Sequence, residues 1–219
     1  MSNPLYFVTN CKESMTVSWA SPLPMSCGLT KNGDLRMPQN FWKTNPLIFD
    51  DSFPVTPTEN CLKNLKLICE KGSILDFERP GNHFHWRIIQ TMEGWKVSPL
   101  WLPEAFAPMS EKALLMCNSS IPHNNWQQFC QSLQRKYPNR WVLEFQPICW
   151  EKKLPATAKP QSPQYLEAAV CMCRVTENSV IYYDNLKTLQ RKMQIARACG
   201  CQGGIALWEE WKDKTMAQP

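Results

Sequence analysis

The amino-acid sequence predicts an α/β protein, specifically a small (β/α)8 TIM-type barrel with irregular or trimmed N-terminal units. Two observations support this prediction. Short apolar runs alternate with capped amphipathic helices, and acidic or polar residues recur where the runs end. A strand, a helix and a second strand in sequence build a parallel sheet with a right-handed crossover. The chain has 219 residues, near the lower limit of about 200 for such barrels, so we expect one domain over residues 1–219.

The N-terminal quarter is the irregular part of this prediction. Leu5–Val8 and Thr16–Ala20 are apolar enough to be strands. The residues between them are too few for a helix, so the two runs either pair as a hairpin or include only one strand. The first clear strand is Leu47–Asp51, an apolar run that ends in two acids.

A helix and a strand that ends in acids follow. Thr56-Pro57-Thr58-Glu59 is typical of a capping box with proline at the first helical position, and Gly72 ends the helix. The strand Ser73–Glu78 comes next. Because side chains alternate across a strand, Asp76 and Glu78 share a face, with their Cα atoms about 7 Å apart. We expect burial and like-charge repulsion at the end of this strand to raise the pKa of one of the two carboxyl groups, as a general acid needs.

The alternation continues to the C-terminus. The further helices are expected over Asn82–Glu93, from Pro122 to Tyr137, and from a cap at Asp184 to an end at Gly200. The further strands are expected at Val97–Leu102, Ala113–Cys117, Trp141–Phe145 and Gly203–Glu209. Ala168–Val175 and Val180–Tyr183 are typical of a hairpin. The proline-containing segment Leu154–Pro163 is predicted to be a loop insertion.

The composition indicates a reducing compartment. Met1-Ser2-Asn3-Pro4 has neither a basic segment nor a long apolar one, and no run reaches transmembrane length. The eleven cysteines are odd in number and scattered, which favours buried thiols over a disulfide framework. The net charge of +5 is mild and no lysine or arginine run occurs, so no nucleic-acid partner is expected. We therefore expect a cytoplasmic monomer that binds neither nucleic acid nor membranes.

Three segments resemble a known enzyme family. Gly72–Glu78 resembles the strand-four signature DGxxxDxE of the chitinase-like glycoside hydrolases of family 18, especially of their spore-germination branch. Gly203–Glu209 is similar to the family's closing strand, which ends in a tryptophan. Met116-Cys117-Asn118 stands where the family has M-x-Y. The resemblance is good over residues 46–78 and 180–211 and loose elsewhere.

The resemblance implies hydrolysis of a polysaccharide that contains N-acetylhexosamine, such as chitin or peptidoglycan, without a cofactor or a metal. Glu78 would be the general acid that protonates the glycosidic oxygen. Asp76 would orient the 2-acetamido group of the substrate, whose carbonyl oxygen acts as an internal nucleophile. Trp208 would form a floor beneath the distorted sugar. Asn118 and Gln146 would complete the substrate-binding residues.

Departures from the family keep a second interpretation open. Lys71 replaces the first aspartate of the signature, Ile74 replaces a polar residue, and Asn118 replaces a tyrosine. The alternative is a non-catalytic carbohydrate-binding or scaffold barrel derived from the family. Each site feature also has a purely structural explanation: the two acids could pair with Arg79 or Lys71 at the end of a strand, and Trp208 could be a core residue. The spore-germination branch also makes a spore-associated location compatible with the resemblance.

Two patterns resemble metal sites but have a structural explanation. His83-x-His85 falls in a predicted helix, where residues i and i+2 diverge. Cys171-x-Cys173 and Cys199-x-Cys201 lack the two-residue spacer usual in structural zinc sites. The sequence therefore predicts no metal.

Overall fold

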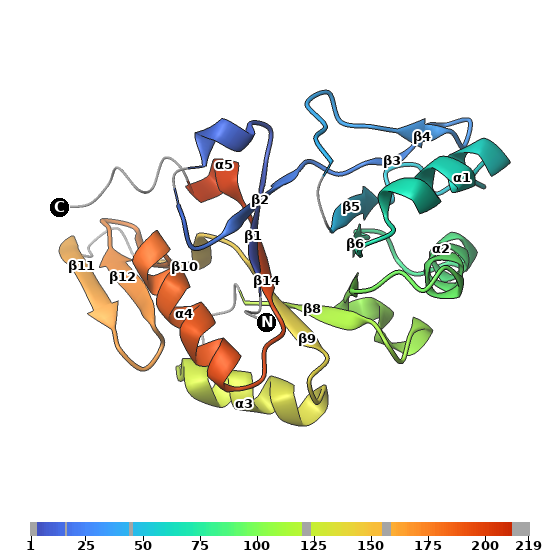
Figure 1. The fold of residues 1–219 in the computed structure, drawn as a ribbon. Coiled ribbons are helices and arrows are strands. Elements are labelled where there is room, and N and C mark those ends of the chain that lie inside the picture. Colours follow the sequence, from blue (N-terminus) through green and yellow to red (C-terminus); the bar gives the residue numbers. More distant parts are fainter. Residues whose placement is uncertain (1–3, 16, 44–45, 120–123, 155–158, 212–219) are drawn as a thin grey trace. The chain divides into compact units, whose positions relative to one another are not determined.

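The computed structural model describes residues 4–15, 17–43, 46–119, 124–154 and 159–211 (Figure 1). The chain divides into two compact units. One comprises residues 1–7 and 117–219, and the other comprises residues 8–116. None of the helices in the described ranges is long and apolar enough to cross a membrane.

Eight strands form the main sheet. They are β1 (Leu5–Thr9), β2 (Ser21–Pro24), β5 (Leu47–Asp50), β6 (Ser73–Asp76), β7 (Leu100–Pro103), β8 (Leu114–Asn118), β9 (Trp141–Phe145) and β14 (Gly204–Leu207). Their order is β2-β1-β14-β9-β8-β7-β6-β5. The pairs β5–β6, β6–β7, β7–β8 and β9–β14 are parallel, as the alternation of strands and helices predicts.

The two ends of this strand order meet at Cys27. This residue, just after β2, forms a parallel bridge with Phe49 of β5. The Cys27 N–H donates to the carbonyl of Ile48 at 2.9 Å, and the Asp50 N–H donates to the carbonyl of Cys27 at 2.8 Å. The chain just beyond the first strand of the order is therefore hydrogen-bonded to the last strand, and the fold class is the predicted (β/α)8 barrel.

The unit of residues 8–116 holds two α-helices among its described residues, α1 and α2, and Figure 1 shows them near β5 and β6. Its remaining elements are η1 (Lys12–Ser14), β3 (Gly28–Leu29), β4 (Leu35–Arg36), α1 (Glu59–Ile68), α2 (His83–Gly94) and η2 (Glu104–Met109). The N-cap of α1 is Thr58, whose Oγ1 accepts a hydrogen bond from the Cys61 N–H at 3.1 Å. The helix thus begins later than the predicted capping box at Thr56, because the hydroxyl of Thr58 satisfies the free N–H.

Of the two alternatives for the N-terminal runs, the structure confirms that only one is a strand. Leu5–Val8 lies in β1, whereas residues 17–20 form no strand and the next strand is Ser21–Pro24; Thr16 itself lies outside the described residues. Prolines at positions 22 and 24 conceal this strand in the sequence, because proline removes a ladder donor and is tolerated only at special positions in a sheet.

The other unit contains β9 and β14, in register with Gly204 opposite Leu143. Its helices are α3 (Trp126–Lys136), α4 (Leu186–Ala198) and α5 (Trp208–Trp211). The predicted start of α3 at Pro122 lies outside the described residues, and Asn125 is its N-cap. The last strand ends at Leu207 and not at the predicted Glu209, because the chain turns into α5.

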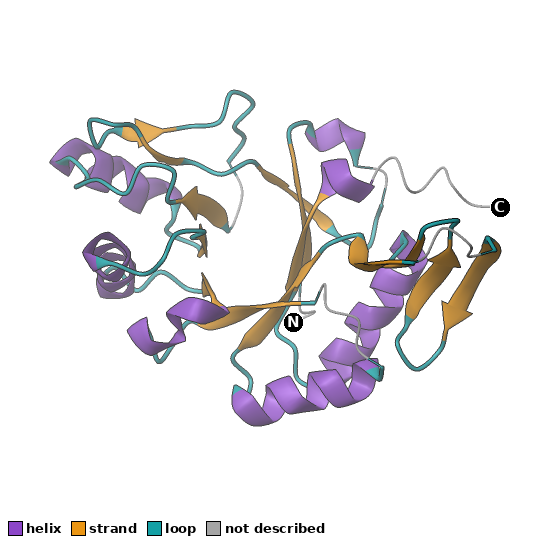
Figure 2. Ribbon diagram, turned by 180° about the vertical axis from the view of Figure 1, so that it is seen from behind, coloured by secondary structure: helices purple, strands orange, loops and turns teal. Residues whose placement is uncertain are grey.

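A four-stranded antiparallel sheet belongs to the same unit (Figure 2). Its strands are β10 (Ile148–Lys153), β11 (Gln161–Leu166), β12 (Cys171–Val175) and β13 (Ser179–Tyr183), in the order β10-β13-β12-β11. The predicted hairpin is confirmed as β12 and β13. The predicted loop insertion Leu154–Pro163 was wrong at its end, where β11 begins. This strand is polar and exposed along almost its whole length, so it lacks the apolar alternation that identifies a strand. The register between β11 and β12 shifts between Gln161 and Gln164.

The cap of α4 differs from the prediction by one residue. Asn185 is the N-cap, and its side chain accepts from the Thr188 N–H while the Thr188 hydroxyl accepts from the Asn185 N–H, both at 2.9 Å. Asp184 instead forms a buried ion pair with Lys192, with Nζ and Oδ2 2.6 Å apart. The predicted cap is therefore wrong, because Asp184 is paired with Lys192, about two helical turns further along the chain.

Candidate active site at the end of β6

Asp76 and Glu78 follow a strand that is buried up to its last residue. Ser73, Ile74 and Leu75 are buried, and β6 ends at Asp76, which lies opposite Asp50 of β5 in the parallel register. Glu78 lies after the strand, and both Asp76 and Glu78 are exposed. The expectation that the carboxylates share the burial of the strand was wrong, because the chain leaves the ladder as they begin. Their exposure makes both accessible to a dissolved ligand.

The backbone of Glu78 is fixed by a carboxylate on the neighbouring strand. Asp51 directly follows β5, and its Oδ1 accepts a hydrogen bond from the Glu78 N–H at 3.2 Å. Its Oδ2 accepts another from the Arg79 N–H at 2.9 Å. The Asp51 side chain is only 4% exposed. The segment after β6 is therefore tied to the end of β5 through two consecutive backbone donors.

A buried histidine holds the same carboxylate. Nε2 of His85, in α2, lies 2.9 Å from Oδ2 of Asp51. The other ring nitrogen, Nδ1, accepts a hydrogen bond from the Asn82 N–H at 3.1 Å. An accepting Nδ1 carries no proton, so the hydrogen-bond pattern assigns the proton to Nε2, which donates to Asp51. The His85 ring is fully buried and packs edge-on against Phe77 at 4.7 Å between centroids.

These contacts keep Asp51 ionised. Burial raises its pKa, but the hydrogen bonds from His85 and from the backbone N–H groups of Arg79 and Glu78 outweigh the burial and hold the pKa below its usual value. Sequence reasoning missed both Asp51 and His85 as functional candidates. The signal that could have found Asp51 is its place at the end of the strand next to Asp76.

Asp50, the partner of Asp76 in the register, has contacts of its own. Its Oδ2 accepts from the Ser26 hydroxyl at 2.7 Å and from Nη2 of Arg36. Burial raises the pKa of Asp50, while hydrogen bonds from Ser26, Ser52 and Arg36 together hold it below its usual value. An ionised carboxylate paired with a cation thus lies on the strand next to Asp76.

The other three predicted site residues lie in the unit of residues 117–219. Asn118 ends β8 and Gln146 follows β9, and both are exposed. These two strands are neighbours, and the Ser119 N–H donates to the carbonyl of Glu144 at 3.0 Å. Trp208 follows β14, the next strand of the order. The structure therefore places these three residues after the carboxyl ends of three adjacent strands.

Trp208 differs from the other two in its exposure. Its side chain is 2% exposed, and its ring packs edge-on against Phe7 at 5.1 Å between centroids. This packing makes Trp208 a core residue, which is the alternative that the sequence leaves open for it. Its contact with a sugar stays a prediction.

No family profile and no curated protein matches the sequence of the chain, but solved structures match its fold. The spore cortex-lytic enzyme SleL of Bacillus megaterium QM B1551 has 10% sequence identity and a TM-score of 0.58, over 92% of this chain and 69% of that one. A GH18 chitinase from Cycas revoluta in complex with (GlcNAc)3 has 12% identity and a TM-score of 0.58, over 88% and 89%. The chitinase-like agglutinin RobpsCRA from Robinia pseudoacacia has 10% identity and a TM-score of 0.58, over 93% and 94%.

The chain has the fold of a family 18 chitinase. At these identities the likeness establishes the fold alone. The chitinase-like fold agrees with the resemblance of Gly72–Glu78 to the strand-four signature, since β6 is the strand that ends in Asp76.

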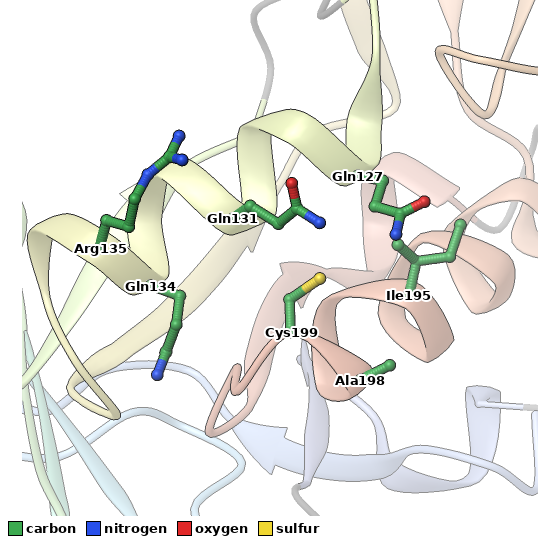
Figure 3. A pocket seen from close by; sticks show the side chains of 7 residues that line it. All are labelled: Gln127, Gln131, Gln134, Arg135, Ile195, Ala198 and Cys199. Atoms are coloured by element: carbon green, nitrogen blue, oxygen red, sulfur yellow. The ribbon is translucent and has the colours of Figure 1, made fainter.

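A pocket lies between α3 and α4 (Figure 3). Its volume is about 540 Å³. It is lined by Gln127, Gln131, Gln134, Arg135, Ile195, Ala198 and Cys199. The Gln134 side chain is already engaged, because its Oε1 accepts from the Trp141 indole N–H at 2.9 Å. None of the predicted site residues lines this pocket.

Two residues of the metal-like patterns, His85 and Cys201, have hydrogen-bond partners within the protein. Within the described ranges, no group of three or more histidine, cysteine or acidic side chains could hold a metal ion. His85 is bound to Asp51, and Cys201 donates to the carbonyl of Gly203 at 3.1 Å.

Proposed function

We propose that the protein is a glycoside hydrolase that cleaves a polysaccharide containing N-acetylhexosamine, of the chitin or peptidoglycan type. The observation that carries this proposal is the exposed pair Asp76 and Glu78 at the carboxyl end of a buried parallel strand, where barrels of this class place their catalytic groups. The solved relatives of the same fold include a chitinase and a spore cortex-lytic enzyme.

The proposed reaction is substrate-assisted hydrolysis with retention. Glu78 donates its proton to the glycosidic oxygen as the bond to the leaving sugar breaks. The acetamido carbonyl oxygen of the substrate attacks the anomeric carbon, and Asp76 stabilises the positive charge that develops on the acetamido nitrogen. Water then opens the cyclic intermediate, with Glu78 acting as the base that takes its proton.

Three further residues would bind the sugar. The amides of Asn118 and Gln146 can donate to a carbonyl or hydroxyl oxygen. Contact of the sugar with the apolar face of Trp208 would require this ring, which is 2% exposed, to leave its packing against Phe7. We also propose that the chain is a monomer in a reducing environment such as the cytoplasm or a spore. For the reducing environment, the supporting observation is that seven of the ten described cysteines are buried, as structural thiols are.

A second candidate function is carbohydrate binding without turnover. Ile74 stands where the family signature has a polar residue, and it is buried in β6, so no carboxylate on that strand lies behind Asp76. The Robinia pseudoacacia protein of the same fold is an agglutinin. In this function Asp76 and Glu78 would hydrogen-bond sugar hydroxyl groups.

The two functions are separated by turnover. Hydrolysis of chitooligosaccharides and of peptidoglycan fragments would be measured with the wild type, Glu78→Gln and Asp76→Asn, alongside binding of the same sugars. Glu78→Gln keeps the shape of the side chain but removes the acid, so turnover should fall by about 10²- to 10⁴-fold with binding retained. Glu70→Gln, an exposed glutamate after α1, is the matched control. Binding without turnover in the wild type would favour the second function.

A further inference from the structure

We propose that Asp51 and His85 are positioning residues that hold the Glu78 backbone in place for catalysis. This inference rests on the proposed function, because it assigns Glu78 the role of general acid. It starts from the place of Glu78, which lies beyond the end of β6 where the strand ladder no longer restrains the chain. Each backbone residue that is held in one conformation costs about 1–2 kcal/mol of entropy, so a catalytic group after a strand needs a dedicated restraint.

Asp51 supplies this restraint as a carboxylate. Its two oxygens accept three hydrogen bonds, from the Glu78 N–H, the Arg79 N–H and the His85 ring. Only an ionised carboxylate accepts at both oxygens with no proton of its own. Hydrogen bonds to an ionised acceptor are about twice as strong as neutral ones. An asparagine in its place would turn an NH₂ group toward one of these donors.

His85 fixes the orientation of Asp51. The ring is held from the other side by the Asn82 N–H, and the Asn82 side chain caps α2 by accepting from the Phe84 N–H at 2.9 Å. Three aromatic rings surround the imidazole at centroid distances of 4.7 to 5.2 Å: Phe77, Phe84 and Phe106. These hydrogen bonds hold the Asp51 carboxylate between the start of α2 and the residues that follow β6. We call the pair Asp51 and His85 the clamp. Because a displacement of about 1 Å can reduce turnover about 100-fold, this clamp bears directly on catalysis.

Three variants test the clamp. Asp51→Asn removes the second accepting oxygen. His85→Phe keeps an aromatic ring in the aromatic cluster and removes both hydrogen bonds of the imidazole, whereas His85→Gln keeps a donor that can reach Asp51. Asp184→Asn is the control for loss of stability, because it breaks a buried ion pair in the other unit. Each protein would be measured for kcat and KM on a chitooligosaccharide, for its thermal midpoint, and for amide hydrogen exchange at Glu78 and Arg79.

The expected result is a fall in kcat of about 10- to 100-fold in Asp51→Asn and His85→Phe, with KM nearly unchanged and faster exchange at the two amides. His85→Gln should recover most of the kcat, and Asp184→Asn should leave kcat and both amides unchanged. Wild-type kcat in Asp51→Asn and His85→Phe would overturn the inference while leaving the proposed function intact. It would also be overturned if kcat fell in all four variants in proportion to their thermal midpoints, since the role would then be structural.

An inactive wild-type protein would refute the proposed function. Amide hydrogen exchange at Glu78 and Arg79 would then show whether the clamp restrains the backbone. Faster exchange in Asp51→Asn and His85→Phe, with native-like exchange in His85→Gln, would support the clamp on the backbone. Unchanged exchange in every variant would overturn it.

Discussion

Nε2 of His85 and Oδ2 of Asp51 are 2.9 Å apart, and the two side chains are 0% and 4% exposed. A carboxylate that leaves water is costly unless its oxygens are hydrogen-bonded. Here every hydrogen bond that Asp51 accepts comes from a residue after β6 or in α2. The Asp51 carboxylate thus connects three parts of the chain: the end of β5, the residues after β6, and α2. Its protonation should therefore lower the free energy of unfolding.

The first prediction concerns acid. The folded state holds the pKa of Asp51 below its usual value of 3.8, so the stabilisation is fully present above the unfolded pKa and is lost as the pH falls through the folded pKa. Urea unfolding of the wild type at a series of pH values should therefore show stability falling below pH 3.8. Asp51→Asn should be less stable at neutral pH and should lose less on acidification. Equal acid dependence in Asp51→Asn and the wild type would contradict this account, and Glu70→Gln serves as the exposed control.

The second prediction concerns the buried ion pair between Asp184, which precedes α4, and Lys192 in that helix. Lys192 Nζ lies 2.6 Å from Asp184 Oδ2 and 4.7 Å from the centroid of the Trp126 ring. Removing one partner leaves the other charge buried, so Lys192→Met should reduce the free energy of unfolding by about 3–5 kcal/mol. The double variant Lys192→Met/Asp184→Asn should lose less than the sum of the two single variants. Additive losses would mean that the pair is not coupled. Lys187→Met, at an exposed position of the same helix, is the control.

The third prediction concerns thiol reactivity. Burial raises the pKa of Cys69 and Cys171 to about 11 and that of Cys201 to about 12, and the thiolate is the reactive form. Iodoacetamide should label exposed Cys11 first, and the buried cysteines only after unfolding. Mass spectrometry of the denatured protein under non-reducing conditions should find all eleven cysteines alkylated. Pairs of cysteines that resist alkylation until a reductant is added would contradict the free-thiol state.

The fourth prediction concerns two glycines. Gly33 has φ +82°, and a Cβ there would overlap the carbonyl oxygen of Thr56. Gly33→Ala should therefore destabilise the fold by about 1–3 kcal/mol. Gly94, the last residue of α2, has no atom within 4 Å of a Cβ built on it, so Gly94→Ala should stabilise by about 0.5–1 kcal/mol. Chemical unfolding of the two variants checks the contrast, and equal effects of the same sign would contradict it.

The sequence predicts well the strands that are continuous apolar runs. The apolar run at Leu47 and the run at Ser73 each became a parallel strand, because both faces of such strands are buried and their composition shows it. Strand β11 was missed since its residues are polar and exposed. A strand that buries almost nothing leaves no apolar pattern to detect.

The candidate site likewise contains residues that the sequence identifies and residues that it does not. Asp76 and Glu78 could be singled out because a single strand carries them. The contact between Asp51 and His85 spans 34 residues, and it depends on which strands are neighbours and on where α2 begins. The burial of these two side chains and the exposure of the acids also depend on where β6 ends. None of this is encoded in local spacing, so only the folded structure reveals it.

The shift of register in β11 has a consequence for association. This strand is an edge of the antiparallel sheet, and Pro163 lies within the interruption between Gln161 and Gln164. Proline offers no N–H to an incoming strand, and a local irregularity breaks the straight row of donors and acceptors that another chain would need. The edge is thereby a poor template for sheet extension between molecules. A polar strand that buries almost nothing thus protects the protein against edge-to-edge aggregation.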